Sequence, residues 1–216
     1  MTQELQAHFF TMETSPGLYR EFGRFRQHYF VEYLDWMLTT IDGMEVDEFD
    51  QPTSRYCVLR ERGRTIGGFR MIDGSLPTLT AKICPSINET YLQAHDLSLM
   101  EITRFGADRR IAQARTVSQI IYALMLQYGY LTEANGLVAI VDLLHERLLK
   151  RMGLVIERFG DAFTLPSASG AKLDVVAGQI PLTRQKHDVM EAFNAALNLV
   201  EIYDDTNVLG SKRLSA

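Results

Sequence analysis

Hydrophobic residues recur along this chain with two periods, and each period predicts one kind of element. Apolar side chains three and four positions apart predict helices at 18–38, 116–130, 143–152 and 189–203, with a shorter helix at 86–94. Short apolar or alternating runs predict strands at 55–60, 65–72, 99–105, 137–141, 155–158, 163–165 and 175–181. Strands interleaved with helices, after an early hairpin, indicate the α/β class: a single mixed, largely antiparallel sheet flanked by helices.

Irregularities in the pattern refine this fold. Gly67 and Gly68 interrupt the second strand and indicate a bulge or a close approach of another backbone. Residues 137–141 are continuously apolar, which is typical of a strand buried on both faces. Residues 73–85 follow neither period, and the polar tail after Asp204 is expected to be loose.

Composition limits the class of protein. The 216 residues, 46% of them hydrophobic, suffice for a sizeable core, and we expect a single domain over residues 1–216. A formal net charge of −5 argues against sequence-independent binding of nucleic acid. The N-terminus lacks the pattern of a signal peptide, and the longest apolar run is too short to cross a bilayer. We therefore expect a cytoplasmic protein with no membrane insertion.

The metal-ligating residue types are scattered. Cys57 and Cys84 show no zinc spacing and are expected to be buried free thiols. The five histidines include no pair at helical ligand spacing, so we predict no metal site.

Charged and aromatic residues gather between positions 25 and 50, without a glycine-rich nucleotide loop. Such a set can bind a molecule that is cationic in one part, anionic in another and flat in a third, as S-adenosylmethionine is. Its spacing resembles the signature of the acyl-homoserine lactone synthases, the LuxI-type autoinducer synthases. The matching residues are Arg26, Phe30, Trp36, Glu45, Asp47, Phe49 and Asp50.

Two downstream segments extend the resemblance, which is strongest over residues 18–165. Family members carry an Arg just after a Val-Gly or Ile-Gly of the return strand, and here Arg70 comes after Ile66-Gly67; residues 101–105 read Glu-Ile-Thr-Arg-Phe, which matches a second family motif. The chain departs from the family at Tyr33, where a basic residue is usual, and at Cys84, where Phe is common. The resemblance implies an acyltransferase architecture like that of GNAT-type acetyltransferases.

The resemblance also implies a reaction that uses S-adenosylmethionine and an acyl thioester as substrates, with no cofactor. The amine of S-adenosylmethionine takes the acyl group, and lactone closure then releases methylthioadenosine, giving a quorum-sensing signal. Glu101 is the implied proton acceptor, and Arg70 and Arg104 are implied to hold carboxylates. The implied substrate-binding residues are Arg26, Phe30, Trp36, Asp47, Asp50, Thr103 and Phe105.

An acyl pocket is expected between the sheet and the helix at 116–130. Its predicted lining residues are Cys84, Leu137, Ala139 and Val141. Family members that make 3-oxo lactones often carry a Thr in this strand, and residues 137–141 contain no hydroxyl, so the strand favours an unsubstituted chain. The donor can be an acyl carrier protein or acyl-CoA; the basic pairs at 109–110 and 150–151 are candidate contacts for an acidic carrier.

One structural interpretation and two alternative functions remain. Taken singly, each charged residue is an ordinary surface group and each aromatic ring an ordinary core group. A GNAT-type N-acyltransferase acting on another amine would bind a pyrophosphate near residues 109–114, but the first glycine of that motif is missing. A non-catalytic binding module would bind S-adenosylmethionine without turnover. The N-acyltransferase would have no reason to carry the joint pattern of residues 26–50.

Overall fold

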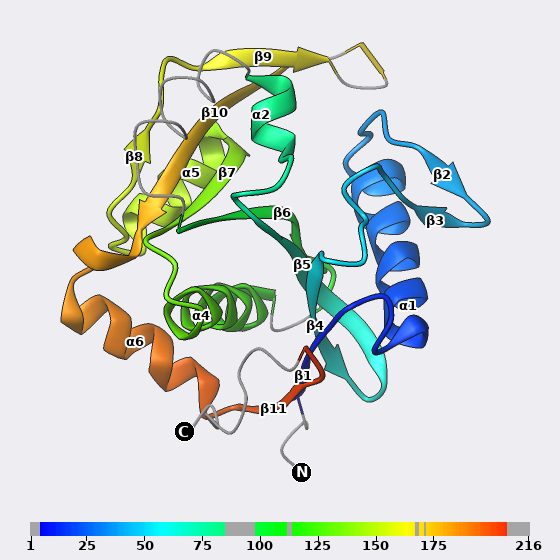
Figure 1. Ribbon diagram of the computed structural model, residues 1–216, viewed down its shortest axis with the longest axis horizontal. Helices are drawn as coiled ribbons and strands as arrows, with labels where there is room; N and C mark the ends of the chain where they lie inside the picture. The colour runs from blue at the N-terminus through cyan, green and yellow to red at the C-terminus, as the bar shows by residue number, and fades with distance from the viewer. Residues whose placement is uncertain (1–4, 85–97, 112–113, 167–168, 171, 207–216) are drawn as a thin grey trace.

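The structure is a computed structural model that describes residues 5–84, 98–111, 114–166, 169–170 and 172–206. A long mixed sheet runs through these residues in the order β11-β1-β4-β5-β6-β7-β10-β8, with β9 also paired to β10 (Figure 1). Its strands are β1 (Leu5–Phe10), β4 (Arg55–Glu61), β5 (Arg64–Asp73), β6 (Leu99–Ala107), β7 (Gly136–Asp142), β8 (Glu157–Arg158), β9 (Phe163–Pro166), β10 (Lys172–Pro181) and β11 (Val200–Asp204). A separate hairpin joins β2 (Thr40–Ile41) to β3 (Met44–Glu45).

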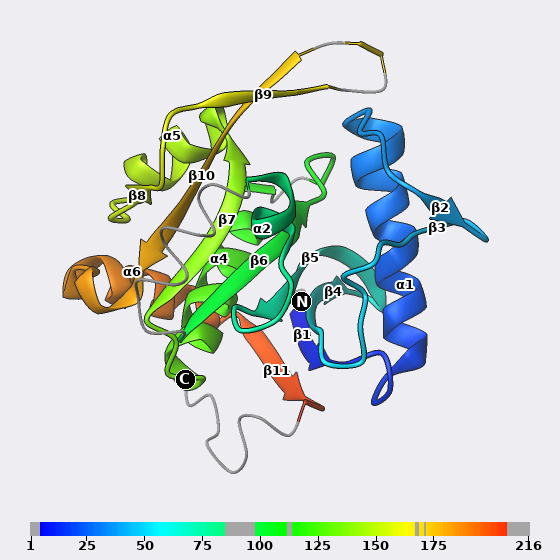
Figure 2. The ribbon, with the colours of Figure 1, turned by 45° about the horizontal axis from the view of Figure 1, so that its top comes forward.

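Helices cover both faces of the sheet. The helical segments are α1 (Pro16–Arg26), the π-helix η1 (Gln27–Tyr33), α2 (Leu79–Ile83), α4 (Ala114–Leu131), α5 (Leu143–Arg151), the 3₁₀ turn η2 (Leu182–Arg184) and α6 (His187–Leu197). Helix α1 lies on one side of the central strands and α4 with α6 on the other (Figures 1 and 2). Within the described residues, no helix is long and apolar enough to cross a membrane.

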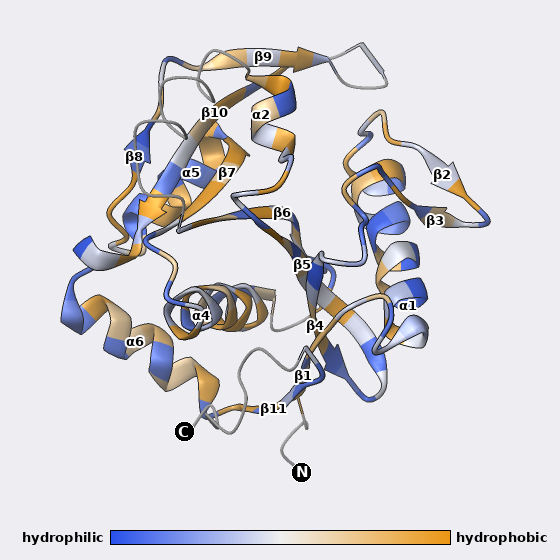
Figure 3. Cartoon of the chain, viewed as in Figure 1, coloured by the Kyte–Doolittle hydropathy of each residue, from blue (hydrophilic) through white to orange (hydrophobic). Residues whose placement is uncertain are grey.

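The core is divided by the sheet into two layers. A small hydrophobic cluster of three aromatic residues, Phe10, Phe22 and Tyr56, with Val58 fills the space beneath α1. A much larger cluster surrounds α4, whose buried side chains pack on β5, β6 and β7. Figure 3 shows the hydrophobic colouring along α4 and β7. The expected α/β class and mixed sheet are confirmed.

Strands β6 and β7 are paired over only part of their length. The parallel pairing joins Leu99–Glu101 to Gly136–Val138 and then stops, although both strands continue. Residues 139–142 of β7 remain paired to β10 on their other side. We call the space between the two strands beyond their last pair the wedge.

A β-bulge lies where β6 leaves β7. Arg104 and Phe105 together stand opposite Phe69 alone, because Arg70 pairs with Thr103 and Gly68 with Gly106. Arg104 has a positive φ of 54°, which is uncommon for a residue with a side chain. The bulge allows Thr103 and Arg104 both to contact charged groups on the α1 side, while Phe105 packs with the α4 cluster.

Several expected elements are wrong in extent. The last helix ends at Leu197, and the alternating residues after it form β11, which lies parallel to the unexpected strand β1. The first helix changes to a π-helix at Gln27 and ends at Tyr33, and the segment read as irregular contains α2. Strand β8 is only two residues long, and β7 is fully buried only at its first three residues. The helix expected at 86–94 and the tail from 207 lie outside the described residues.

The glycine pair marks a close approach of neighbouring groups, as its sequence indicated. A Cβ at Gly68 would lie 2.4 Å from the carbonyl oxygen of Cys57 and 2.9 Å from Phe22. Gly68→Ala should therefore lower the free energy of unfolding by about 1–3 kcal/mol, as overpacking does, measured by urea denaturation. Gly160→Ala is the control, because a Cβ there meets nothing within 4 Å. Equal stability of the two variants would contradict this account.

Candidate active site

Arg26, the last residue of α1, begins a chain of buried ion pairs. Its Nε donates to Glu45 Oε2 at 2.5 Å, and its Nη1 and Nη2 donate to the two oxygens of Asp50 at 2.8 and 3.0 Å. Arg26 and Glu45 are fully buried. A buried charge needs this kind of multiple, geometrically matched pairing to offset its lost hydration.

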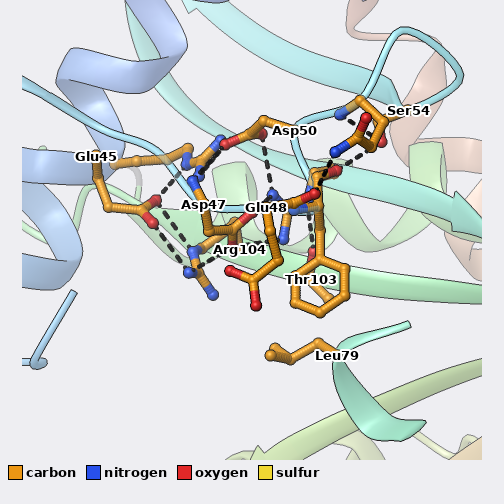
Figure 4. Close-up of polar contacts among 12 residues, drawn as sticks. Glu45, Asp47, Glu48, Asp50, Ser54, Leu79, Thr103 and Arg104 are labelled. Atoms are coloured by element: carbon orange, nitrogen blue, oxygen red, sulfur yellow. Dashed lines mark hydrogen bonds and ion pairs between the residues drawn. The ribbon is translucent and has the colours of Figure 1, made fainter. Parts of the chain in front are cut away.

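Two further arginines complete the chain (Figure 4). Arg104 donates from Nε and Nη2 to the two oxygens of Glu45 at 3.0 and 2.9 Å, and from Nη2 to Asp47 at 2.8 Å. Arg70 donates to the two oxygens of Asp47 at 2.5 and 2.9 Å, and to Asp50 at 2.9 Å. Three guanidinium groups and three carboxylates thus alternate in a closed loop, which we call the ion-pair ring.

Local structure places each acid of the ring. Asp42 and Gly43 both have positive φ, as a two-residue hairpin turn requires, and β3 then directs Glu45 toward the end of α1. The next acids are fixed by the turn that contains them. Asp47 N donates to Asp50 Oδ2 at 2.9 Å, and Phe49 N donates to Asp47 Oδ1 at 2.9 Å. The turn thus presents Asp47 and Asp50 side by side.

Two hydroxyl groups support the ring from the sheet. Thr103 Oγ1 accepts a hydrogen bond from Arg70 Nε at 2.9 Å, and Tyr56 OH donates to Asp50 Oδ1 at 3.0 Å. The sequence interpretation included Thr103 and missed Tyr56, whose apolar surroundings gave no signal. It also quoted Glu45 in the signature without assigning it a site role, yet Glu45 binds two of the three arginines.

The arginines keep the ring acids ionised. Burial raises the pKa of Asp50, but hydrogen bonds and charge from Arg26, with the charge of Arg70, outweigh it and hold that pKa well below its usual range. The same balance, with Arg70 and Arg104 as partners, lowers the pKa of Asp47. These two carboxylates therefore stay ionised at neutral pH.

Glu101 lies in a different environment, at the N-terminus of α2. Its two oxygens accept the backbone N–H groups of Leu79 at 2.8 Å and Thr80 at 2.6 Å. Its side chain is almost completely buried, and this burial raises its pKa, whereas the two N–H groups and the charge of Arg70 act in the opposite direction. Glu101 is thus a carboxyl group with a raised pKa.

The aromatic residues of the signature pack together next to the ring. Phe30, in the π-helix, is buried; its ring centroid lies 4.9 Å from that of Trp36, which is partly exposed. A Cβ at Gly106 would come within 3.3 Å of Phe30, so this layer rests closely on β6. Phe105 does not join it; Phe105 stacks on Tyr122 of α4, with ring centroids 4.4 Å apart.

The predicted acyl-pocket residues lie along β7 and near it. Leu137 is in the core, whereas Ala139 and Val141 are half-buried beyond the last pairing of β7 with β6. Cys84 is buried at the end of α2, a helix that contacts both β6 and β7. These positions leave the pocket assignment a prediction.

The candidate basic contacts are partly neutralised. Arg110 pairs with Asp108, and Lys150 pairs with Glu146, which also binds Arg158. Arg109 and Arg151 are exposed. Among the residues that the structure describes, no cluster of three or more His, Cys, Asp or Glu could hold a metal ion.

Known proteins resemble the chain in sequence and in fold. The family described as autoinducer synthase matches residues 11–190. A probable acyl-homoserine-lactone synthase of Sinorhizobium fredii is 30% identical over 173 residues, covering 76% of this chain and 80% of that protein. Among solved structures, the CoA-dependent acyl-homoserine lactone synthase BjaI, with SAM and isopentyl-CoA, has a TM-score of 0.75 at 17% identity over 92% of this chain and 93% of that one.

A more distant likeness concerns the fold alone. A putative N-acetyltransferase from Lactobacillus plantarum has a TM-score of 0.53 at 13% identity, covering 82% of this chain and 99% of that one. The expected acyltransferase architecture is therefore confirmed.

The ring predicts that arginine cannot be replaced by lysine within it, because lysine keeps the charge but loses the planar fork. Arg70→Lys and Arg104→Lys should each lower the free energy of unfolding by about 1.5–3 kcal/mol for every charged hydrogen bond lost. Arg62→Lys is a matched control, because Arg62 is exposed and has a φ of 51°, close to the 54° of Arg104. Denaturation curves and enzyme assays on all three variants check this, and equal tolerance would show that the ring contributes little.

Proposed function

Because the chain belongs to the autoinducer synthase family, we propose that its ion-pair ring and Glu101 form the site where an acyl group passes to the amine of S-adenosylmethionine. The observation that carries the proposal is the closed ring itself. Residues 26–50, Arg70 and Arg104 are separated in sequence, and they meet in one buried cluster. An ordinary surface ion pair consists of one acid and one base in contact with water. It does not require three arginines and three acids from separate segments to be buried together.

The ring is accessible at one side only, and this side suits the amino-acid part of S-adenosylmethionine. Asp47 and Arg104 have side-chain exposures of 12% and 5%, the largest in the ring. Arg104 Nη1 donates to no group in the described part of the chain, so it is available for a substrate carboxylate. Asp47 can face the ammonium or the sulfonium, and Trp36 with Phe30 can cover the flat adenine.

The wedge suits the acyl thioester. Beyond the last β6–β7 pair, residues 139–142 of β7 have one edge that does not pair with β6. A pantetheine arm, with two amide groups, can form strand-like hydrogen bonds with such an edge. BjaI, bound to isopentyl-CoA, has the same fold. An acyl carrier protein presents the same arm, so either carrier fits this site.

The reaction then follows in two steps. Glu101 accepts one proton from the ammonium, directly or through water, and the free amine attacks the thioester carbonyl. The thioester carbon–sulfur bond breaks, the second amine proton passes to the departing sulfur, and an amide and a thiol form. The substrate carboxylate next attacks its own γ-carbon, and the carbon–sulfur bond breaks. The products are an acyl-homoserine lactone and methylthioadenosine. The carboxylate loses its negative charge as the sulfonium loses its positive charge, so the step is balanced.

The first test is turnover. With S-adenosylmethionine and an acyl thioester, the protein should release equal amounts of methylthioadenosine and acyl-homoserine lactone, measured by mass spectrometry. We propose that no metal or cofactor takes part, so EDTA should leave the rate unchanged. Acylation of an unrelated amine without lactone would favour an N-acyltransferase, and binding of S-adenosylmethionine without turnover would favour a binding module.

The second test concerns Glu101 as the base. Glu101→Gln should lower kcat by about 10²- to 10⁴-fold, as loss of a general base does. In the natural protein kcat/KM should fall as the pH falls through the pKa of Glu101. Since burial raises that pKa, this acid limb should lie above the ordinary value of about 4.3. The limb should be absent from the variant.

A control separates catalysis from support of α2. Glu48 forms an exposed ion pair with Lys82 of α2 and is not bound to Glu101. Glu48→Gln therefore loosens α2 and leaves the proposed base in place. If Glu48→Gln and Glu101→Gln lose the same activity and both keep the acid limb, Glu101 only holds the helix.

A further inference from the structure

A polar pair, formed by a buried tyrosine and a half-buried histidine, lies outside the ring and has no role in the reaction described so far. Tyr122 of α4 and His145 of α5 are hydrogen-bonded, with 2.5 Å between the tyrosine oxygen and Nε2. Phe105 of β6 stacks on Tyr122 and meets the edge of His145 at 5.4 Å between centroids. We call these two hydrogen-bonded residues the Tyr–His pair.

The position of the pair relates it to the wedge. Phe105 is on β6 past its last pairing with β7, and His145 is in the first turn of α5, which begins directly where β7 ends. Tyr122 reaches between them from α4. The side chains of Phe105, Tyr122 and His145 thus link β6 to the end of β7 at the open end of the wedge. The acyl thioester is proposed to bind there.

The Tyr–His pair retains one unused hydrogen-bond donor. If Tyr122 donates to Nε2, the neutral imidazole carries its proton on Nδ1; in the other tautomer the tyrosine hydroxyl is the spare donor. His145 Nδ1 has no hydrogen-bond partner within the described ranges. Burial lowers the pKa of His145, a shift that the charge of Asp142 opposes and that of Arg109 reinforces. The imidazole of His145 is therefore neutral at pH 7.

We propose that the Tyr–His pair is a specificity contact that hydrogen-bonds an oxygen on the acyl chain near the thioester, and so selects oxo- or hydroxy-substituted donors. This inference rests on the proposed function. An alkyl chain in the wedge would exclude water and leave the spare donor unpaired, whereas a carbonyl or hydroxyl oxygen would satisfy it.

The pair changes what the acyl pocket is expected to prefer. Residues 137–141 contain no hydroxyl, and that strand alone favours an unsubstituted chain. The polar contact instead comes from helices α4 and α5, outside the strand on which that expectation was based. If the acyl chain covers the spare donor and excludes water from it, the cost of leaving it unpaired corresponds to a preference of about 5- to 150-fold for the substituted chain.

The experiment is a competition between matched donors. Hexanoyl, octanoyl and decanoyl thioesters, each unsubstituted or carrying a 3-oxo or 3-hydroxy group, are offered in equal amounts on CoA and, separately, on acyl carrier protein. The ratio of substituted to unsubstituted lactone is measured for the natural protein, for Tyr122→Phe and for His145→Leu. We expect the natural protein to form more of the substituted lactone. In both variants the ratio of substituted to unsubstituted lactone should move toward 1:1.

Matched controls test the specificity of that shift. Tyr130→Phe removes a hydroxyl on the same helix, one that donates to the Leu182 carbonyl at 2.7 Å. His187→Leu removes an exposed histidine of α6. Both should keep the natural rate and ratio.

Each outcome decides between the two claims. Lactone formation without preference in the natural protein, or a preference unchanged in Tyr122→Phe, overturns the inference and leaves the proposed function standing. No lactone from any donor overturns the proposed function and this inference with it. Tyr122→Phe removes only one oxygen from a stacked ring, so it remains informative if His145→Leu fails to fold.

Discussion

The alternating ring of three arginines and three acids is the constraint on which the rest of this site depends. It joins the end of α1, the turn after β3, and strands β5 and β6. Because the charges balance, the ring is neutral, and each buried ion has two opposite partners. Removal of one member leaves an unpaired buried charge, which typically costs about 3–5 kcal/mol. The ring therefore requires all four segments to be in place at once.

The bulge in β6 allows one strand to contact both the ion-pair ring and the aromatic residues of α4. A regular strand would send Thr103 and Arg104 to opposite faces. The positive φ of Arg104 instead lets both residues contact the ring, while Phe105 turns toward α4. The proposed S-adenosylmethionine site and the proposed acyl-thioester site are thus consecutive along the backbone. The strained residue lies at the junction between them, where backbone strain is often retained for function.

The sequence predicted the convergence of the charged signature residues better than it predicted the ends of the chain. The signature residues carry their own chemistry, so their convergence could be inferred before any fold was known. Strands β1 and β11 are different, because both depend on partners distant in sequence: β11 pairs with β1, almost 200 residues away, and β1 pairs with both β11 and β4. Leu5, Ala7 and Phe9 do alternate with polar residues, so a period-two signal was present and overlooked. The left-handed turn at Arg104 had no such signal, since nothing local favours it.

Contrasting environments separate the roles of the carboxylates. Asp47 and Asp50 have lowered pKa values because arginines surround them, so they hold positive charge well and accept protons poorly. For Glu101, the backbone N–H groups and the charge of Arg70 do not outweigh the effect of burial, so its pKa is raised. A raised pKa suits a proton acceptor that works near neutral pH. Two N–H groups of α2 fix its direction. Carboxylates thus anchor the ring in one place, and in another a carboxylate is the proposed base, because burial without a directly bonded arginine leaves Glu101 more able to take up a proton.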